Sequence, residues 1–536
     1  MSTDSTRRRF LRTLAAGGAA AALPVPQYLL AQTAPALITA PGARPQLLLG
    51  VQSGDPLANR AMVWSRSDRP ARMWVEWATQ SNFQGATRVR GPHVLETSDY
   101  VGALDLLGLP EDADIFYRVM MQDLSNERVF SEPVVGHMRT APGEDRHRRS
   151  RNVKFVWGGD TAGQGYGINP DFGGMRMYAQ MQREHPDFFI HSGDTVYADG
   201  PIEASRTAPD GSIWRNIVTE EVSKVAETLN EFRGRYRYNM MDSNVRAFNS
   251  DVAQIWQWDD HEVTNNWSDS KNLSGDARYT EKNVPLLIAR GTKAFLEYAP
   301  LRHTADVELE RVYRQIPYGA LLDIFVVDMR SYRGPNTFNQ QPVEDSNTAF
   351  FGPRQFDALK RGLKNSRAVW KVIAADMPIG LNIGDGVDAQ GRARWEAIAN
   401  GENGAASGRE LEIARLLSFI KREGISNVVW VTADVHYTAA HYYDPGKAAF
   451  TDFTPFWEFV AGPLNAGSFG PNTTDGTFGI QVVYQKTPPA PNTAPSAGFQ
   501  FYGVVEIDGR TRELKVSLKD IVGTTLFTKV LEPRRG

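Results

Sequence analysis

The sequence predicts an α/β protein with a small all-β domain near its N-terminal end, and two patterns carry this prediction. Between about residues 45 and 140, short alternating or aromatic runs such as 73–77 and 115–119 are separated by turn residues, which is typical of a small β-sandwich. From residue 153 onward, apolar runs that end in polar clusters alternate with helical periods such as 411–422. That second pattern is typical of α/β folds.

Length and composition narrow the classes of protein that fit. A chain of 536 residues exceeds the size at which one core stops growing, so we expect two domains or one large domain with insertions. The formal net charge of -3 gives no reason to expect specific nucleic-acid binding. Because the chain has no cysteine, disulfides and thiolate ligands are excluded, and any metal must be held by oxygen and imidazole.

Residues 1–36 have the pattern of a twin-arginine export signal followed by a short spacer. Arg7, Arg8 and Arg9 precede a short apolar run at 14–23, and small residues follow at 31–36. The apolar run is too short to span a bilayer comfortably, so we expect removal and no stable membrane anchor. The alternative is an ordinary amphipathic helix with chance arginines. The pattern therefore predicts a periplasmic or secreted protein that uses the twin-arginine (Tat) export machinery.

The domain boundaries follow from breaks in the pattern. The charged stretch 141–150 interrupts the periodicity and is a plausible linker. We therefore expect an N-terminal β-sandwich domain over 45–140 and a larger α/β domain over 150–536. Near the C-terminal end, the runs 501–507 and 513–518 flank Asp508 and Gly509, which predicts a β-hairpin.

Acidic side chains follow five of the predicted strands. In open α/β sheets, ligands gather outside the carboxyl ends of the strands, so these positions are candidates for a functional site. Taken alone, each of them could equally be a helix cap or a turn residue. The five clusters contain Asp160, Asp194 with Tyr197, the group 259–262, Asp376, and Asp434 with His436.

Three of these clusters have chemistry that suggests a metal ion. A phenolate ligand requires a hard, highly charged ion, so Tyr197 points to a trivalent metal if it is a ligand. The segment 259–262 places three acids and one histidine at four positions, and such crowding is costly unless a cation or solvent offsets it. Asp434 and His436 lie two positions apart and would share one face of an extended segment.

The order and spacing of the five clusters resemble those of the dinuclear metallophosphatases. Within that superfamily, the segments 191–201, 258–263 and 433–436 are similar to the PhoD-like alkaline phosphatases, and the resemblance extends from about residue 45 to the end of the chain. It implies a metallophosphatase-type β-sandwich flanked by helices, with a small N-terminal immunoglobulin- or fibronectin-like domain.

The resemblance also implies a ligand set for two metal ions. One ion would be held by Asp160, Tyr197 and His436, a second by Asp260, Asp376 and Asp434, and Asp194 would bridge them. Phenolate and imidazole suit Fe3+ at the first position, and an all-carboxylate set suits Ca2+ at the second. Some PhoD-like enzymes carry cysteine near the position of Asp160, which leaves zinc or manganese open at the first site.

The implied activity is the hydrolysis of phosphate mono- and diesters by a hydroxide activated between two metal ions. His261 is the candidate that protonates the leaving oxygen, or it supports the neighbouring ligand Asp260. Arg330 is the candidate that binds a phosphate oxygen, or it forms a structural salt bridge with Asp328. Asn265 and Asn266, in the same way, could bind phosphate or act structurally.

Two alternative functions remain at this stage. Members of the same family cleave phospholipid head groups, so a phospholipase-D-like phosphodiesterase is the nearest alternative. A secreted calcium-binding or carbohydrate-binding module is more distant, because it leaves Tyr197 and His261 without a role.

Overall fold

The structure is a computed structural model that describes residues 41–144, 150–303 and 308–534. Residues Pro45–Gly536 form one compact unit. The predicted export signal at 1–36 lies outside the described residues, as does part of the predicted linker. In the portion of the chain that is described, none of the helices combines the length and apolar character needed to cross a membrane.

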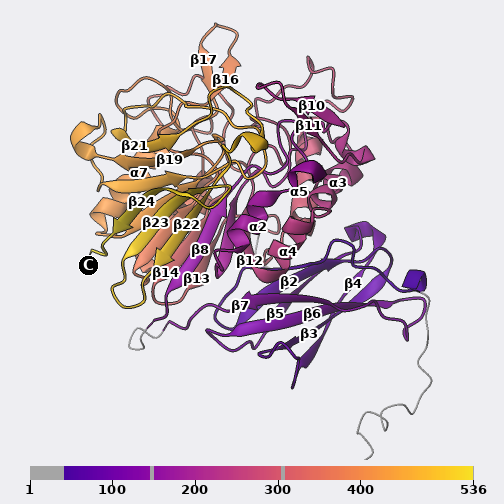
Figure 1. The fold of residues 1–536 in the computed structure, drawn as a ribbon. Helices are drawn as coiled ribbons and strands as arrows, with labels where there is room; N and C mark the ends of the chain where they lie inside the picture. The colour runs from indigo at the N-terminus through magenta and orange to yellow at the C-terminus, as the bar shows by residue number, and fades with distance from the viewer. Residues whose placement is uncertain (1–40, 145–149, 304–307, 535–536) are drawn as a thin grey trace, which may run out of the picture. The chain divides into compact units, whose positions relative to one another are not determined.

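Among the described residues, two large β-sheets pack face to face (Figure 1). The first contains, in spatial order, β24 (Thr525–Leu531), β23 (Leu514–Asp520), β22 (Phe501–Ile507), β8 (Val153–Gly158), β9 (Phe188–Ser192), β12 (Ala253–Gln257), β1 (Val51–Gly54), β2 (Arg60–Arg66) and β5 (Val101–Leu107). The second contains β13 (Arg314–Tyr318), β14 (Leu322–Val326), β15 (Trp370–Ala374), β18 (Val428–Thr432), β20 (Phe456–Val460), β19 (Thr438–Tyr443) and β21 (Ile480–Lys486).

Helices cover the outer faces of both sheets. Side chains of α2 (Arg176–Gln182) and α4 (Ser243–Asp251) pack on β8 and β9, and α3 (Leu229–Asn239) and α5 (Val284–Tyr298) pack beside β12. On the second sheet, α6 (Gly352–Asn365) and α7 (Glu410–Arg422) pack on β14, β15 and β18. The predicted α/β fold, a β-sandwich flanked by helices, is therefore confirmed.

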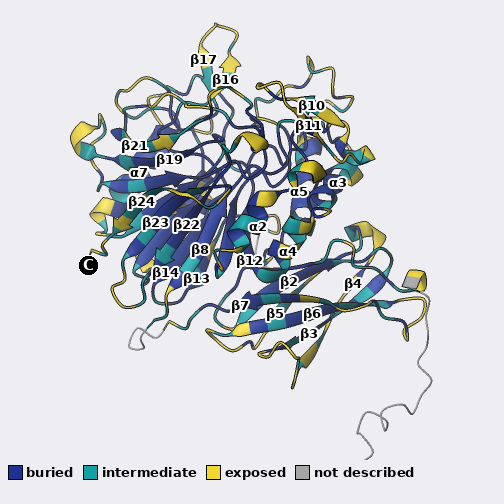
Figure 2. Cartoon of the chain, in the orientation of Figure 1, coloured by how far each residue is buried: buried dark blue, intermediate teal, exposed yellow. Residues whose placement is uncertain are grey.

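Burial on both faces explains why the central strands are continuous apolar runs in the sequence. In β8, Phe155 and Trp157 point into the core between the sheets, whereas Val156 packs against α2 and α4. Figure 2 shows the central strands almost uniformly buried. Parallel strands that are covered on both sides lack the alternation of apolar and polar residues found in half-exposed strands, and these central strands lack it too.

The predicted N-terminal all-β region is present, but one of its two sheets continues beyond this region. A four-stranded sheet contains β4 (Thr87–Val94), β3 (Ala71–Ala78), β6 (Asp114–Asp123) and β7 (Val134–Arg139). The facing strands β1, β2 and β5 continue the nine-stranded sheet, because β1 pairs in parallel with β12 at Gly54 and Gln254. This pairing satisfies backbone groups that an unpaired edge of β12 would leave exposed.

A buried ion pair joins the end of β1 to the second sheet. Asp55 is 1% exposed and accepts hydrogen bonds from Arg314 Nε at 3.0 Å and Nη2 at 2.7 Å. The backbone N–H of Arg302 donates to the same carboxylate at 2.7 Å. Because every donor comes from residues far along the chain, this carboxylate fixes the N-terminal strands to the segment that begins β13.

The C-terminal hairpin and the last helix agree with the sequence. β22 and β23 are antiparallel, with Ile507 opposite Leu514, so the predicted hairpin is confirmed with a longer connection than a two-residue turn. Helix α7 begins at Glu410, whose carboxylate is 1% exposed and accepts from Asn400 Nδ2 at 3.0 Å. Burial is the main cause that raises the pKa of Glu410 to about 8, and the negative charge of the nearby Asp475 is the second.

We predict that Asp55→Asn destabilises the fold by roughly 3 kcal/mol, because removing one partner of a buried ion pair leaves the other charge uncompensated. Urea unfolding followed by tryptophan fluorescence measures the change. As a control, Asp171→Asn removes a pair with Arg215 in which both side chains are about two-thirds exposed, and should leave the midpoint unchanged. Equal midpoints for Asp55→Asn and wild type would contradict the importance of this contact.

We also predict a pH-dependent contribution from Glu410. The pKa of Glu410 in the folded state, about 8, lies above the ordinary value of 4.5. The stabilising contribution of the protonated Glu410 side chain is therefore complete below pH 4.5 and is lost as the pH rises through 8. The effect is on the order of a few kcal/mol. Glu410→Gln should therefore flatten the fall in melting temperature between pH 5 and pH 9, measured by scanning calorimetry. The exposed substitution Glu402→Gln is the control, and identical slopes for Glu410→Gln and wild type would refute the prediction.

Candidate metal centre

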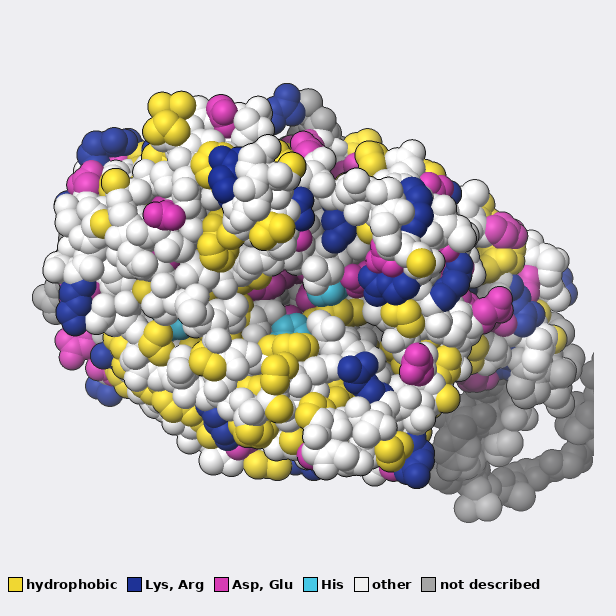
Figure 3. All heavy atoms as spheres, turned by 90° about the horizontal axis from the view of Figure 1, so that it is seen from above, with side chains coloured by type: hydrophobic (Ala, Val, Ile, Leu, Met, Phe, Trp, Pro, Cys, Tyr) yellow, Lys and Arg dark blue, Asp and Glu magenta, His cyan; other side chains and the backbone are white. Residues whose placement is uncertain are grey.

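The carboxyl ends of parallel strands from both sheets meet at one end of the sandwich. Strands β8, β9 and β12 are parallel in the first sheet, as are β14, β15 and β18 in the second. The loops that follow these strands carry Asp160, Asp194, Asp260, Asp376 and Asp434. Seen from above, this end of the molecule has a hollow in which acidic and histidine side chains are visible (Figure 3). The predicted ligands thus come from five loops that share one end of the fold.

The backbone at these positions is strained. Asp160, Asp194, Asp434 and His436 have φ angles of 68°, 51°, 65° and 59°, in the left-handed region that residues with a Cβ rarely adopt. Each such residue costs about 1–3 kcal/mol, and such strain concentrates at functional sites. Gly193 allows the loops after β9 and β12 to approach, since a Cβ there would lie 2.5 Å from that of Asp259.

The first predicted ligand group is assembled. One ligand atom from each of Asp160, Asp194 and His436 lies within 4.8 Å of the others. The Tyr197 hydroxyl donates to His436 Nε2 at 2.8 Å, while His436 Nδ1 donates to the carbonyl of Gly467. Burial lowers the pKa of His436 to about 4, so its imidazole is neutral, which is the form that binds metals.

A second group lies beside the first and shares Asp194 with it, but it contains His261 and not Asp376 or Asp434, which were predicted to join Asp260. Ligand atoms of Asp194, Asp260 and His261 lie within 4.8 Å of one another. The His261 backbone N–H donates to Asp194 Oδ1 at 3.1 Å, which ties the two loops together. Asp376, at the end of β15, is buried, and its Oδ2 lies 3.4 Å from Arg330 Nε. Asp434, after β18, is half-buried, with its Oδ2 atom inaccessible.

The donor chemistry of this cluster fits metal cations. Within the described part of the chain, several buried carboxylate oxygens have no hydrogen-bond donor, namely both oxygens of Asp160 and of Asp376 and the Oδ2 atoms of Asp259 and Asp434. Burial and the neighbouring carboxylates raise the pKa values of Asp160, Asp194 and Asp434 well above the usual range of an aspartate side chain. Unpaired buried carboxylates are costly, and cations with oxygen, imidazole and phenolate ligands would offset this cost.

Arg330 is surrounded by carboxylates. Its side chain is 0% exposed, and Nε donates to Asp259 Oδ1 at 2.6 Å while Nη1 pairs with Glu396. A salt bridge with Asp328 was one of the two roles that the sequence left open for Arg330, but Asp328 instead accepts the backbone N–H of Arg330 at 2.9 Å. Asp328 is equally buried, but its oxygens already accept hydrogen bonds from Trp258 Nε1 and Ser331 Oγ. The guanidinium therefore pairs with acids from other loops, which otherwise lack a counter-charge.

Sequence reasoning gave no individual role to two acids that hold the site in place. Glu262 accepts the backbone N–H groups of Asp194 at 3.2 Å and Asp259 at 2.8 Å, so it fixes the loops after β9 and β12. Asp199 Oδ1 accepts a hydrogen bond from His261 Nδ1 at 2.6 Å. Both lie inside the segments that carry the resemblance, but their contacts join positions more than 60 residues apart.

The charge of His261 follows from these contacts. Burial acts to lower its pKa, but Asp199, Asp260 and Asp194 outweigh burial and raise the pKa of His261 well above its usual range. The same interaction lowers the pKa of Asp199 to about 2, although burial acts in the opposite direction. With Nδ1 used by Asp199, Nε2 of His261 is directed toward the cluster, 4.0 Å from Asp260 Oδ1.

Asn266 is a structural link at the rim of the site. Its backbone N–H donates to Asp260 Oδ2, and its side chain donates to the carbonyl of Gly384 at 3.2 Å. Gly384 begins the hairpin formed by β16 (Gly384–Val387) and β17 (Ala393–Trp395), which projects at the top of Figure 1. Of the two roles expected for Asn266, this contact corresponds to the structural role.

Comparisons with known proteins identify relatives of the whole chain. The family of PhoD-like phosphatases matches residues 155–518, and the N-terminal domain of PhoD-like phosphatases matches residues 32–142. Alkaline phosphatase D of Bacillus subtilis (strain 168) is 28% identical over 451 residues, which covers 79% of this chain and 70% of that protein.

Two solved structures share the fold. The structure of PhoD aligns with a TM-score of 0.68 and 21% identity, covering 93% of this chain and 92% of that one. Purple acid phosphatase PPD1 from yellow lupin (Lupinus luteus) seeds aligns with a TM-score of 0.53 and 11% identity, covering 91% and 74%. The family match extends over more than half of the sequence and includes all five loops that carry the buried acids. The chain therefore belongs to the PhoD-like phosphatase family.

Proposed function

We propose that this protein is an exported, metal-dependent hydrolase of phosphoric mono- and diesters. The observation that carries the proposal is the convergence of acids from five strand ends on a cluster in which several buried oxygens have no donors among the described residues. Membership of the PhoD-like phosphatases and the similarity to alkaline phosphatase D support the same reaction class. The arginine-rich pattern of residues 1–36 supports export by the twin-arginine route to the periplasm or beyond.

We assign the ligands to two ions by their chemistry. Asp160, Tyr197 and His436 provide phenolate and imidazole, which suit Fe3+, and Asp260, Asp376 and Asp434 provide only carboxylates, which suit Ca2+. Asp194 would be the ligand shared by the two ions, because its side chain lies within reach both of Asp160 and His436 and of Asp260 and His261. When bound, such a pair of ions supplies Lewis acidity toward the phosphoryl oxygens and lowers the pKa of water.

His261 is the proposed proton donor to the leaving oxygen. Asp199 holds its Nδ1–H, which orients the ring and leaves Nε2 to carry the proton that is transferred. The Tyr197 ring lies 4.2 Å from the His261 ring, centroid to centroid, and restricts its rotation. Asp199 is thus a positioning residue that acts through His261.

Arg330 is proposed to position the second ligand group and not to bind substrate. Its fully buried guanidinium contacts Asp259 and Asp376 and would have to abandon these carboxylates to reach a phosphate. By neutralising part of the charge around Asp376, it allows several carboxylates to remain close together in a dry environment. The hairpin of β16 and β17 completes the rim above this group.

We predict that the purified protein contains iron and calcium near stoichiometry and hydrolyses both p-nitrophenyl phosphate and bis(p-nitrophenyl) phosphate. Elemental analysis, together with p-nitrophenol release before and after chelation, measures both properties. Because Asp194 would bridge the two ions, Asp194→Asn should lose metal and activity together.

The exposed substitution Asp210→Asn is the control for this experiment and should keep full metal content and turnover. Full turnover by Asp194→Asn with both metals bound would rule out the bridging role. Metal without hydrolysis of either ester in the wild-type protein would favour a binding module over an enzyme.

We predict that His261→Ala keeps its metal content but loses about 100-fold or more in rate on alkyl phosphates, whose leaving groups need a proton. Activated aryl esters should lose much less, because p-nitrophenolate leaves without one. Asp199→Asn should show the same selectivity with a smaller loss, since it only reorients the ring. Steady-state rates on both ester classes test this, and equal losses on both would be evidence against a proton-donor role.

A further inference from the structure

Glu458 places a carboxylate in the interior of the second sheet. It is the middle residue of β20, is 0% exposed, and lies opposite Trp430 of β18 and His441 of β19. Its neighbours along the same face, Phe456 and Val460, belong to the apolar cluster that packs against α7. Burying a carboxylate there costs free energy unless hydrogen bonds satisfy its oxygens, so the groups that it binds indicate its role.

The hydrogen bonds of Glu458 lead to the loop that follows β15. Its Oε1 atom accepts the backbone N–H of Ile379 at 2.8 Å. Its Oε2 atom accepts from the Tyr443 hydroxyl at 2.8 Å and from His441 Nδ1 at 2.9 Å. The Tyr443 hydroxyl in turn accepts the backbone N–H of Gly380 at 2.9 Å. Two consecutive backbone groups of the loop are therefore held by one carboxylate, either directly or through Tyr443.

This loop carries Asp376, and it is held on both sides of that residue. Strand β15 ends two residues before Asp376, and the Asp376 carbonyl accepts the backbone N–H of Ala433 at 2.8 Å. On the other side, Pro378 has no N–H to donate, and the next two N–H groups are those held by Glu458 and Tyr443. Side chains of β19 and β20 thus replace the sheet pairing that ends with β15.

Packing restricts Tyr443, which connects Glu458 to the loop. The Tyr443 ring stacks on Phe456 with ring centroids 4.5 Å apart and an angle of 6° between the planes. A Cβ at Gly380 would lie 3.0 Å from the Tyr443 hydroxyl, so glycine permits the close approach of the backbone to this group. The hydroxyl is therefore fixed in direction, and the loop is held at a defined distance from β20.

We propose that Glu458 is a positioning residue for the second metal site, which acts on Asp376 through the backbone of Ile379 and Gly380. This inference rests on the proposed function, in which Asp376 is a ligand of the Ca2+ site. Loss of the contacts would let the Asp376 loop move and would weaken Ca2+ binding roughly 10- to 100-fold, which is typical when a partner that orients a ligand is removed. The ligand set assigned to Fe3+ does not include Asp376, so iron should be retained.

The test compares Glu458→Gln with Glu412→Gln in the full-length protein. Glu412 is also buried, and it accepts the backbone N–H groups of Phe350 and Phe351, each at 2.8 Å, but the segment that it holds carries none of the assigned ligands. Both variants should lower the melting temperature, because each leaves buried hydrogen-bonding groups unsatisfied. After treatment with EGTA, calorimetric titration with Ca2+ alone should show binding weakened about tenfold or more in Glu458→Gln only.

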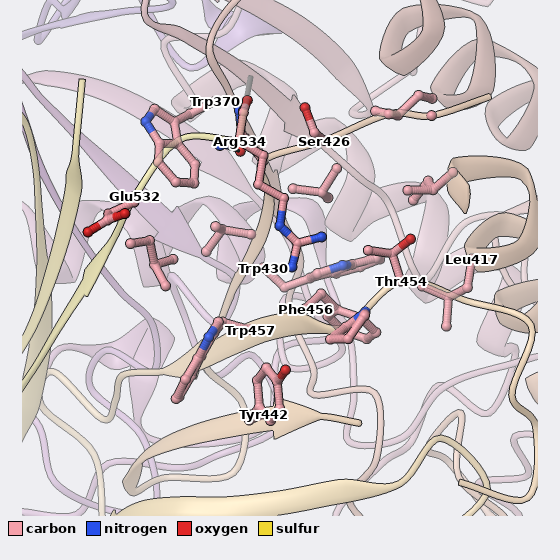
Figure 4. Close-up of a pocket in the computed structure, with 18 residues that line it drawn as sticks. Trp370, Leu417, Ser426, Trp430, Tyr442, Thr454, Phe456, Trp457, Glu532 and Arg534 are labelled. Carbon is pink, nitrogen blue, oxygen red and sulfur yellow. Dashed lines mark hydrogen bonds between the residues drawn. The ribbon is translucent and has the colours of Figure 1, made fainter. Parts of the chain in front are cut away.

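A second control changes the neighbouring residue of the same strand. Trp457 points to the opposite face of β20 and packs against the core between the sheets. It lines a cavity of about 420 Å³ at the amino ends of β15 and β18, away from Asp376 (Figure 4). Trp457→Phe should lower the melting temperature and leave Ca2+ affinity unchanged, which separates the hydrogen bonds of Glu458 from a general distortion of β20.

The outcomes distinguish this inference from the function on which it rests. Ca2+ affinity equal to that of wild type in Glu458→Gln would overturn the positioning role, as would an equal loss in Glu412→Gln or Trp457→Phe. Failure of the wild-type protein to bind Ca2+ would overturn the ligand assignment itself. Tyr443→Phe keeps the ring and removes only the hydroxyl, so it tests the same contact if Glu458→Gln does not fold. It should weaken Ca2+ binding, and unchanged affinity would also refute the inference.

Discussion

Electrostatic repulsion among buried carboxylates is the constraint on which the rest of this structure depends. Five strand ends deliver acids to one region, and Asp160, Asp194 and Asp376 are each almost fully buried there. Arg330 and the protonated His261 offset part of this charge from within the chain, and metal cations would offset the remainder. The two sheets serve this purpose together, because each contributes parallel strands whose carboxyl ends point to the same side.

The sequence was a good guide where structure is set by local pattern. Apolar runs predicted β8, β9 and β18 because strands buried on both faces are apolar throughout, and the acids that follow them were candidates for the same reason. The first ligand group could be proposed from its motifs, and the structure does bring Asp160, Asp194 and His436 together. The roles of these residues as ligands stay predictions.

Contacts between distant segments could not be predicted in this way. Glu396 follows a short exposed strand, so nothing in its neighbourhood indicated that it pairs with Arg330. The pairing of Asp199 with His261 depends on two loops that meet only after β9 and β12 have aligned. Likewise, a short buried strand such as β1, with the sequence Val-Gln-Ser-Gly, does not indicate its neighbour, and its parallel pairing with β12 could not be predicted from the pattern.

The sheet order has a consequence for how the chain reaches its native state. β8, which precedes Asp160, pairs with β9 on one side and with β22, at residues 501–507, on the other. Its neighbourhood is therefore incomplete until almost the entire polypeptide has been synthesised. Such long-range pairing slows folding, because the entropy cost of closing a long loop must be met before the strand contacts form. The centre thus assembles late, because a fragment that ends before residue 501 lacks one of the two strands that flank the strand leading to Asp160.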